Sequence, residues 1–476
     1  MSAFSNEFKH EFKRIIVECC IAMVVGLALT MFVEWAFGEE FVTRQQARAY
    51  APIAGSSYGE GKRDDIRVLL IDDAAIAAAG QTWPARYSYS ARLLRAVGQY
   101  RPKAVFVDIY YSAQRDDDSL PSLLRQVCAL HDQGTKVFLA ANRNRNDEYV
   151  LRPELEELAG KCFEKVAVKY TPDDIDRLAW NYTLALPAEG AGHDAHGEPE
   201  HGMKSAALAL YETTGRTVEV EHHPLALTWG SKSAAHGVAW TSSEPGAAAN
   251  ASYCRDTHGL LSELLPPGIR NSLYADGSKP ICVFHETIRA GQLTETTTEQ
   301  DAQLRQLIEG KILLIGTALS DTSDLILTPL HERIPGVYLH AMALDNLMVF
   351  GDDYARAMHL SLGSPRLLLF LLVAMLFVTL VPKQIMHKLH RYFDGRKKPG
   401  RDWAGAGLYL LWCVGRLIVS LAVGALMLWI GQYWLGLGFL SIINVMVLTL
   451  LAEWFEFNEK LNEYIFPKKE VEHEHH

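Results

Sequence analysis

The sequence lacks several of the local motifs that accompany common enzyme chemistry. It contains no H-E-x-x-H, no phosphate-binding P-loop and no G-x-G-x-x-G after its first predicted strand. Metalloprotease and nucleotide-binding functions would each need one of these patterns to place a metal ligand or a phosphate cradle. No catalytic residue is therefore assigned, and an enzymatic activity is not expected.

The chain is also poor in cysteine and in positive charge. Its seven cysteines include no C-x-x-C pair, which argues against a zinc ribbon or a thioredoxin-like motif. The formal net charge of -10 argues against nucleic acid as a partner, since nucleic-acid binders present a basic face. His193, His196 and His201 lie in a stretch rich in glycine and acid, which favours a solvated loop over a metal site. Neither a metal nor a cofactor is predicted.

Long apolar segments are present, and four of them reach the length of about 20 residues that a membrane-spanning helix requires. They cover residues 15–37, 365–381, 407–430 and 433–454. The first carries acidic residues and is followed by no small-residue cleavage site, so it is expected to remain as an anchor rather than to act as a cleaved signal peptide. The chain is therefore expected to contact the lipid bilayer as a multi-pass protein.

The distribution of lysine and arginine predicts the orientation of these segments. The loop at residues 382–406 is strongly basic, and the N-terminal residues 1–14 are basic near the first span. Basic flanks stay in the cytoplasm, so residues 38–364 are expected to form an extracytoplasmic domain. The tail at residues 455–476 then returns to the cytoplasm.

The extracytoplasmic segment shows the pattern of an α/β fold. Short β-branched and leucine-rich strands are predicted at residues 67–71, 103–107, 136–140 and 311–315. Helical patterns follow at residues 89–100, 120–129, 205–212 and 337–349, and residues 280–286 are a further candidate strand. Strands that alternate with helices indicate βαβ units and a mostly parallel sheet.

Acidic and hydroxyl side chains gather where these strands are predicted to end. The candidate ligand-binding residues are Asp72, Asp73, Trp83, Asp108, Thr317, Ser320, Asp321 and Asp324. Ligands of open α/β sheets bind outside the carboxyl ends of the strands, so these residues are candidates for binding a cation or a polar, basic or hydroxylated ligand. The alternative is that the aspartates cap helices and close turns, which aspartate does commonly.

Charged and sulfur-bearing residues provide two further hypotheses. Four cysteines fall in the extracytoplasmic segment, where disulfides are permitted, and a bridge between Cys254 and Cys282 is expected. Arg416 lies within a predicted span, and Glu18 in the first span is its candidate partner for coupling between spans. Snorkelling of Arg416 toward the basic loop is the alternative, and the two remain open.

The sequence resembles a known sensory family. The motifs VLLIDDAAI, TWPARYSYSARLLRAV, PKAVFVDIYYS, GKILLIGTALSDTSDLILTPL and IPGVYLHAMALDNLM resemble the second type of CHASE domain, over about residues 40–350. The resemblance implies an extracytoplasmic sensory domain at a bacterial plasma membrane, a homo-oligomeric state, and one anchor before the sensor with three spans after it. Such proteins usually continue into a kinase or cyclase domain, whereas only residues 455–476 remain here.

The expected function is therefore that of a membrane-anchored sensor or ligand-binding receptor. It would transmit its state through its transmembrane helices to a separate effector, because no output domain is recognised in the chain. The alternative is a structural or docking subunit of a larger membrane protein assembly. A transporter or channel component is a weaker third hypothesis.

Overall fold

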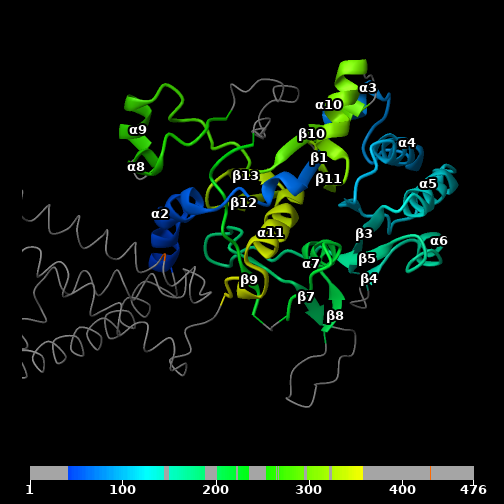
Figure 1. The fold of residues 1–476 in the computed structure, drawn as a ribbon, viewed down its shortest axis with the longest axis horizontal. Coiled ribbons are helices and arrows are strands. Elements are labelled where there is room, and N and C mark those ends of the chain that lie inside the picture. The colour runs from blue at the N-terminus through cyan, green and yellow to red at the C-terminus, as the bar shows by residue number, and fades with distance from the viewer. Residues whose placement is uncertain are drawn as a thin grey trace, which may run out of the picture. The chain divides into compact units, whose positions relative to one another are not determined.

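A mostly parallel β-sheet forms the centre of the described part of the chain (Figure 1). The computed structural model describes residues 41–357 except 144–148, 188–200, 221–222, 235–253, 264, 266, 294–296 and 321–323, together with Trp429. The strand order is β10-β1-β11-β2-β3, and both β4 and β5 pair with β3. The bounds are β1 Ile66–Asp72, β2 Ala104–Val107, β3 Lys136–Arg143, β4 Tyr149–Val150, β5 Glu164–Ala167, β10 Glu286–Arg289 and β11 Ile312–Ala318. Within this sheet, as far as the structure describes it, only the β3–β4 pairing is antiparallel, which confirms the predicted α/β fold.

Helices cover both faces of this sheet (Figure 1). One face carries α3 Asp73–Ala78, α4 Tyr87–Gly98, α5 Leu120–Asp132 and α10 Thr298–Ile308. The other face carries α7 Ala206–Glu212 and α11 Val337–Phe350. The central strands are buried on both sides, which explains why they read as continuous apolar runs rather than alternating ones.

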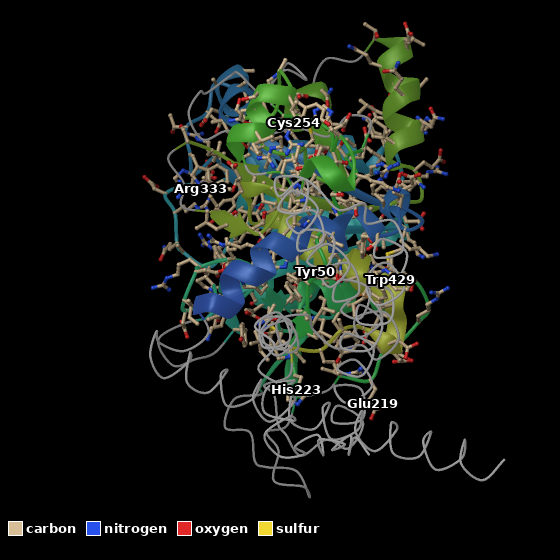
Figure 2. The ribbon with its side chains drawn as sticks, turned by 90° about the vertical axis from the view of Figure 1, so that its left-hand side faces the viewer. Tyr50, Glu219, His223, Cys254, Arg333 and Trp429 are labelled. Carbon is tan, nitrogen blue, oxygen red and sulfur yellow. A yellow bond between two sulfur atoms is a disulfide. The ribbon has the colours of Figure 1, made fainter. Side chains whose placement is uncertain are left out.

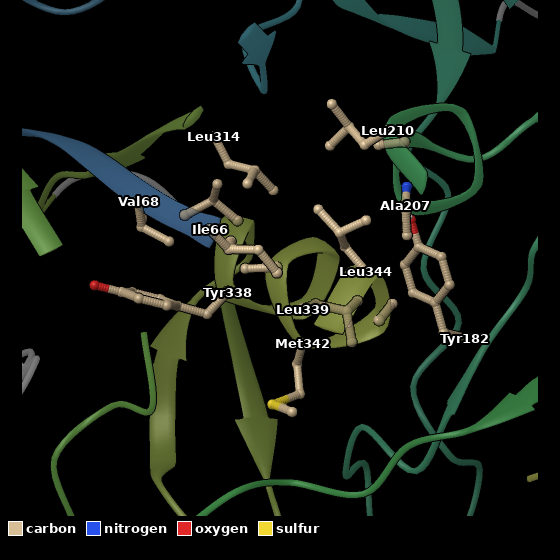
Figure 3. Packing of buried hydrophobic residues seen from close by; sticks show 14 of the residues in the cluster. Ile66, Val68, Tyr182, Ala207, Leu210, Leu314, Tyr338, Leu339, Met342 and Leu344 are labelled. Atoms are coloured by element: carbon tan, nitrogen blue, oxygen red, sulfur yellow. Dashed lines mark hydrogen bonds between the residues drawn. The ribbon is translucent and has the colours of Figure 1, made fainter. Parts of the chain in front are cut away.

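The side chains of β1 contribute to two hydrophobic cores, one on each face of the sheet. Ile66, Val68 and Leu70 pack with α7 and α11, whereas Leu69 and Ile71 pack with α4 and α5. This division follows from the period of two in a strand, which points successive side chains to opposite faces. Figure 3 shows the first of these cores, where α11 lies against β1 and β11.

The remaining elements surround the sheet. They are α2 Phe41–Ser57, α6 Pro153–Glu156, α8 Leu260–Glu263 and α9 Pro267–Leu273, with the strand pairs β6 Asn181–Tyr182 and β9 Leu225–Ala226, β7 Ala185–Pro187 and β8 His201–Lys204, and β12 Leu325–Thr328 and β13 Glu332–Pro335. Figure 2 marks Cys254 on the chain close to α8 and α9. The structure bonds Cys254 to Cys282, the expected pair, with their Cα atoms 5.0 Å apart. It also bonds Cys128 to Cys162, a pair that the sequence did not suggest.

Three predicted strands had a boundary that was wrong by several residues. The strand predicted at residues 136–140 continues to Arg143, because β5 and β4 pair with its last residues. The strand predicted to stop at Gly316 continues through Ala318, because β1 pairs with it up to Asp72 and so extends the ladder beyond the glycine. The strand expected at residues 280–286 begins only at Glu286, where pairing with Arg67 of β1 starts. The apolar character of Ile281 to Phe284 instead reflects burial beside the sheet.

The predicted membrane segments lie outside the described residues. This applies to residues 15–37, 365–381, 407–430 apart from Trp429, and 433–454, and to both Glu18 and Arg416. Among the residues that the structure does describe, no helix is long and apolar enough to cross a membrane.

A buried polar cluster joins the first and last long helices of the domain. Tyr58, which follows α2, donates a hydrogen bond of 2.6 Å to Asp345 Oδ1 on α11. The other carboxylate oxygen of Asp345 lies 3.2 Å from His285 Nε2, and Asn346 Nδ2 donates to the Tyr58 hydroxyl at 3.3 Å. Asn346 also exchanges hydrogen bonds with the backbone of Thr228. Buried groups satisfied in this way hold two elements in one arrangement.

Candidate ligand-binding site

A pocket of about 650 Å³ opens at the carboxyl edge of the sheet. Its floor comes from the ends of β2, β3, β5 and β11, and from the first turns of α11. This volume lies within the range of about 300–1,000 Å³ that small-molecule sites occupy. The location agrees with the rule that open α/β sheets bind ligands outside the carboxyl ends of their strands.

Two carboxylates from distant parts of the sequence meet in this pocket. Asp108 follows β2 directly, and its backbone N–H donates to Ile315 O of the neighbouring strand at 2.8 Å. Asp324 stands at the start of β12, and its own carbonyl accepts a hydrogen bond of 3.0 Å from Gly336 N. The pairing of β12 with β13 thus returns the chain to the sheet and places Asp324 beside the beginning of α11.

Burial and mutual repulsion perturb both carboxyl groups. Burial raises the pKa of Asp108 well above its ordinary value, and the charge of Asp324 raises it further. Burial also raises the pKa of Asp324 to about 6, although a hydrogen bond from the Thr317 hydroxyl acts in the opposite direction. Among the described residues, no lysine or arginine forms an ion pair with either group. The pocket therefore holds two carboxyl groups whose charged forms are disfavoured by burial and by each other.

Aromatic side chains also line the pocket. Its aromatic lining consists of Trp83, Tyr110, Tyr149 and Tyr170. The hydroxyl of Tyr170 is buried and makes no hydrogen bond with the described residues. Burial, with the charges of Asp108 and Asp324, raises the pKa of Tyr110 to about 12, so its phenol is neutral. Aromatic faces beside acidic groups suit a ligand with both apolar and cationic parts.

Two basic side chains complete the lining, and neither neutralises the acids. Arg115 donates hydrogen bonds to the carbonyls of Ala85 and Tyr110, and its guanidinium lies 5.2 Å from the centre of the Tyr87 ring. Lys169 is exposed. The carboxyl groups thus lie at half-buried positions of the lining and the lysine at an exposed one.

Two glycines allow the elements around the pocket to approach one another. A Cβ on Gly316 of β11 would lie 2.5 Å from Val337 Cβ in the first turn of α11. A Cβ on Gly336 would lie 2.5 Å from Asp324 Oδ1. Both distances are shorter than a carbon side chain tolerates, so glycine at these positions lets α11 begin directly above the strand and beside the carboxylate.

The structure brings together only part of the predicted site. Asp108, Asp324, Thr317 and Trp83 line the pocket, whereas Asp321 lies outside the described residues. Their grouping is a geometric fact, and their role in binding stays a prediction.

The other predicted residues lie away from the pocket. The carboxylate of Asp72 accepts a hydrogen bond of 2.8 Å from Ala75 N and so caps α3. The Asp73 carboxylate accepts one of 3.0 Å from Ser320 N. The alternative considered for the aspartates, capping and loop closure, therefore describes the contacts of these two residues. Because α3 starts immediately after β1, the Asp72 and Asp73 side chains form hydrogen bonds with α3 and with the loop after β11, and they do not line the pocket.

Several lining residues were missed from the sequence. Tyr149, Lys169 and Tyr170 belong to a region around β5 for which no strand was predicted. The signal was a short apolar run of β-branched residues and alanine at residues 166–168, VAV, directly before Lys169 and Tyr170. Recognising that run as the end of a buried strand would have placed both side chains at the same sheet edge as Asp108.

The pocket histidine has the features of a buried structural residue. His340 Nδ1 lies 2.7 Å from the Tyr182 hydroxyl, and its Nε2 lies 3.7 Å from Asp108 Oδ2. Burial lowers the pKa of His340 to about 3, so the imidazole is neutral and a weak base.

The sequence also contains a G-x-S-x-G pattern, which is typical of hydrolase nucleophiles, at residues 55–59. Its Ser57 ends helix α2 and donates to Ala54 O at 2.9 Å, whereas a hydrolase nucleophile stands on a turn between strand and helix.

The structure is an α/β domain with a pocket at the carboxyl edge of its sheet. A family model of the CHASE2 domain matches residues 17–381, so the chain belongs to the CHASE2 domain family, a family of sensory domains. No curated protein and no solved structure matches the chain.

Proposed function

We propose that this protein is a membrane-anchored extracytoplasmic sensor that binds a small ligand in the pocket at the carboxyl edge of its sheet. The observation that carries the proposal is the pocket itself, in which the half-buried Asp108 and Asp324 form no ion pair with a lysine or arginine among the described residues. Uncompensated buried charge costs stability, and such groups gather at functional sites. We assign it a binding role and no catalytic residue.

Transmission of the bound state can be traced through α11. Gly336, Leu339 and His340 of this helix line the pocket. One to two turns later the same helix carries Asp345, which holds Tyr58 after α2. We propose that a ligand favouring one position of α11 also changes the contact between Asp345 of α11 and Tyr58 after α2. The chain segments before α2 and after α11 would then pass this change to the predicted membrane spans. The ligand can shift this equilibrium only by its different affinity for the two states.

The cellular setting follows from the sequence and remains part of the proposal. We place residues 38–364 outside the plasma membrane of a bacterium and both termini in the cytoplasm, as the basic flanks favour. The two disulfides support an oxidising compartment. The effector would be a separate protein, and the sensor would act as a homo-oligomer in the lipid bilayer.

The first test uses the full chain purified in mild detergent. A library of small metabolites is screened for compounds that raise its thermal unfolding temperature, and each hit is repeated with Asp108→Asn. A hit that the pocket variant loses, and that the exposed-site control Asp116→Asn retains, supports the sensor. Hits that survive Asp108→Asn, or a library without any hit, contradict it.

A second measurement separates the sensor from a docking subunit. Mass spectrometry of the protein isolated gently from its native membrane identifies what accompanies it and in what ratio. Isolation alone or as a homo-oligomer supports the sensor. Several other subunits in fixed ratio, bound independently of small molecules, would instead make this chain part of a larger assembly.

A further inference from the structure

The charges around the pocket restrict the kind of ligand that it can hold. Its interior presents two carboxyl groups, Asp108 and Asp324, that approach closely enough for the charge of one to affect the other. A ligand that brought another negative charge to this place would add to their repulsion. A positively charged group placed between them would relieve it, and it would supply the partner that a buried carboxylate needs.

The nearest basic side chain cannot supply that positive charge from within the protein. The His340 imidazole is 3.7 Å from Asp108, but it is buried and engaged through its other nitrogen with the Tyr182 hydroxyl. Arg115 is committed to the backbone carbonyls of Ala85 and Tyr110. A cationic ligand group could therefore supply the ion-pair partner that no lysine or arginine among the described residues provides for Asp108 and Asp324.

The aromatic lining indicates what surrounds that charge. Trp83, Tyr110 and Tyr170 line the same pocket as the two carboxyls, and aromatic faces attract organic cations through the negative charge of the ring face. Tyr170 also presents a buried hydroxyl that lacks a hydrogen-bond partner among the described residues and can accept from an N–H group. A bare metal ion would leave the aromatic walls unused, whereas an organic ammonium ion contacts both surfaces.

We propose that the pocket binds a small organic ligand through an ammonium group seated between Asp108 and Asp324, with the carbon skeleton of the ligand against Trp83, Tyr110 and Tyr170. This inference rests on the proposed function, since it names the ligand class of the same site. The exposed Lys169 is the complement for a carboxylate at the other end of such a ligand.

The test uses four probes of similar size and different charge with the full-length protein in detergent. They are n-butylamine, n-butanol, butyrate and 4-aminobutyrate, each titrated at pH 7.5 while binding is followed by ligand-observed NMR and by thermal stability. Butylamine is expected to bind at least tenfold more tightly than butyrate or butanol. Asp324→Asn should weaken butylamine binding at least tenfold, and thermal unfolding of the variant shows that it is folded.

The variant Asp116→Asn provides a matched control, because it removes an exposed carboxylate that does not line the pocket and should leave the binding of all four probes unchanged. Lys169→Gln should weaken 4-aminobutyrate relative to butylamine, because 4-aminobutyrate carries a carboxylate and butylamine does not. Tighter binding of butyrate or butanol, or butylamine binding that ignores Asp324→Asn, overturns the ammonium inference. Absence of binding by both amines overturns it as well. In each of these cases the metabolite library decides separately whether the pocket is a ligand site, so the two proposals can fail independently.

Discussion

Asp324 should destabilise the empty protein at neutral pH, and Asp324→Asn should therefore stabilise it. The pKa of this carboxyl rises from an ordinary value of 3.8 to about 6 on folding. Below pH 3.8 it is protonated in both the folded and the unfolded protein. Between those values the folded protein retains a proton that the unfolded chain releases, so the free energy of unfolding falls as the pH rises. Above about pH 6 the carboxyl is ionised in both states, and the free energy of unfolding falls no further on its account.

The magnitude follows from the size of this shift. A difference of about two pH units corresponds to about 3 kcal/mol at neutral pH. Asparagine keeps an oxygen that can accept from Thr317 but adds an N–H₂ group that needs a partner, which offsets about 1 kcal/mol. The net gain expected at pH 8 is about 1–3 kcal/mol, or roughly 1–5 °C in unfolding temperature for a domain of this size. Loss of the Asp324 charge also lowers the pKa of Asp108.

The assay is thermal unfolding of the full chain in detergent at pH 4.5, 6 and 8, followed by near-ultraviolet circular dichroism. The difference between Asp324→Asn and the wild type should widen as the pH rises through this range. Asp116→Asn removes an exposed carboxylate and should give no such trend. A variant that is less stable than the wild type at pH 8, or a difference that does not depend on pH, would refute the reasoning.

Further variants test the packing and the polar cluster. Gly316→Ala should lower the free energy of unfolding by about 1–3 kcal/mol, because its methyl group would meet Val337, and it should also displace α11 from the pocket. Gly61→Ala, which meets nothing within 4 Å, is its control in the same thermal assay. Tyr58→Phe removes the hydrogen bond to the buried Asp345 and should lower the free energy of unfolding by about 1–3 kcal/mol. Unchanged stability in either buried variant would contradict the packing described.

The main strands could be predicted because a strand buried on both faces is a continuous run of apolar residues in the sequence. Ile66–Asp72 and Ile312–Ala318 are apolar almost throughout, and their place before acidic turns indicated a sheet edge. Asp108 and Asp324 were candidates for the same reason. The ends of the strands were predicted less well, because the ladder partner rather than the residue type decides where pairing stops, as Gly316 shows.

The composition of the pocket could not be predicted in full. Asp72 and Asp108 both follow buried strands, yet one caps a helix and the other faces the pocket. That difference depends on how soon a helix starts after the strand, which residue patterns locate only to within a few positions. Tyr149 and Tyr170 were missed because β4 and β5 are short edge elements whose place beside β3 is set by tertiary packing.

The strand order has a consequence for the making of the protein. β1 lies between β10 and β11, so all of its backbone partners lie near the opposite end of the domain, at Glu286–Arg289 and Ile312–Ala318. During synthesis at about 5–20 residues per second, β1 waits roughly 10–40 s for the first of them. β2, β3 and β5 can pair meanwhile, since they follow one another closely in the chain.

During that interval β1 is an apolar strand whose backbone N–H and C=O groups lack their native pairing partners. Contacts of such long sequence separation also slow folding, because a large loop must close before they form. The newly made chain should therefore depend on chaperones that hold β1 until the last third of the domain arrives. A truncation before β11 should yield aggregated chain, even though most of the domain's residues would be present.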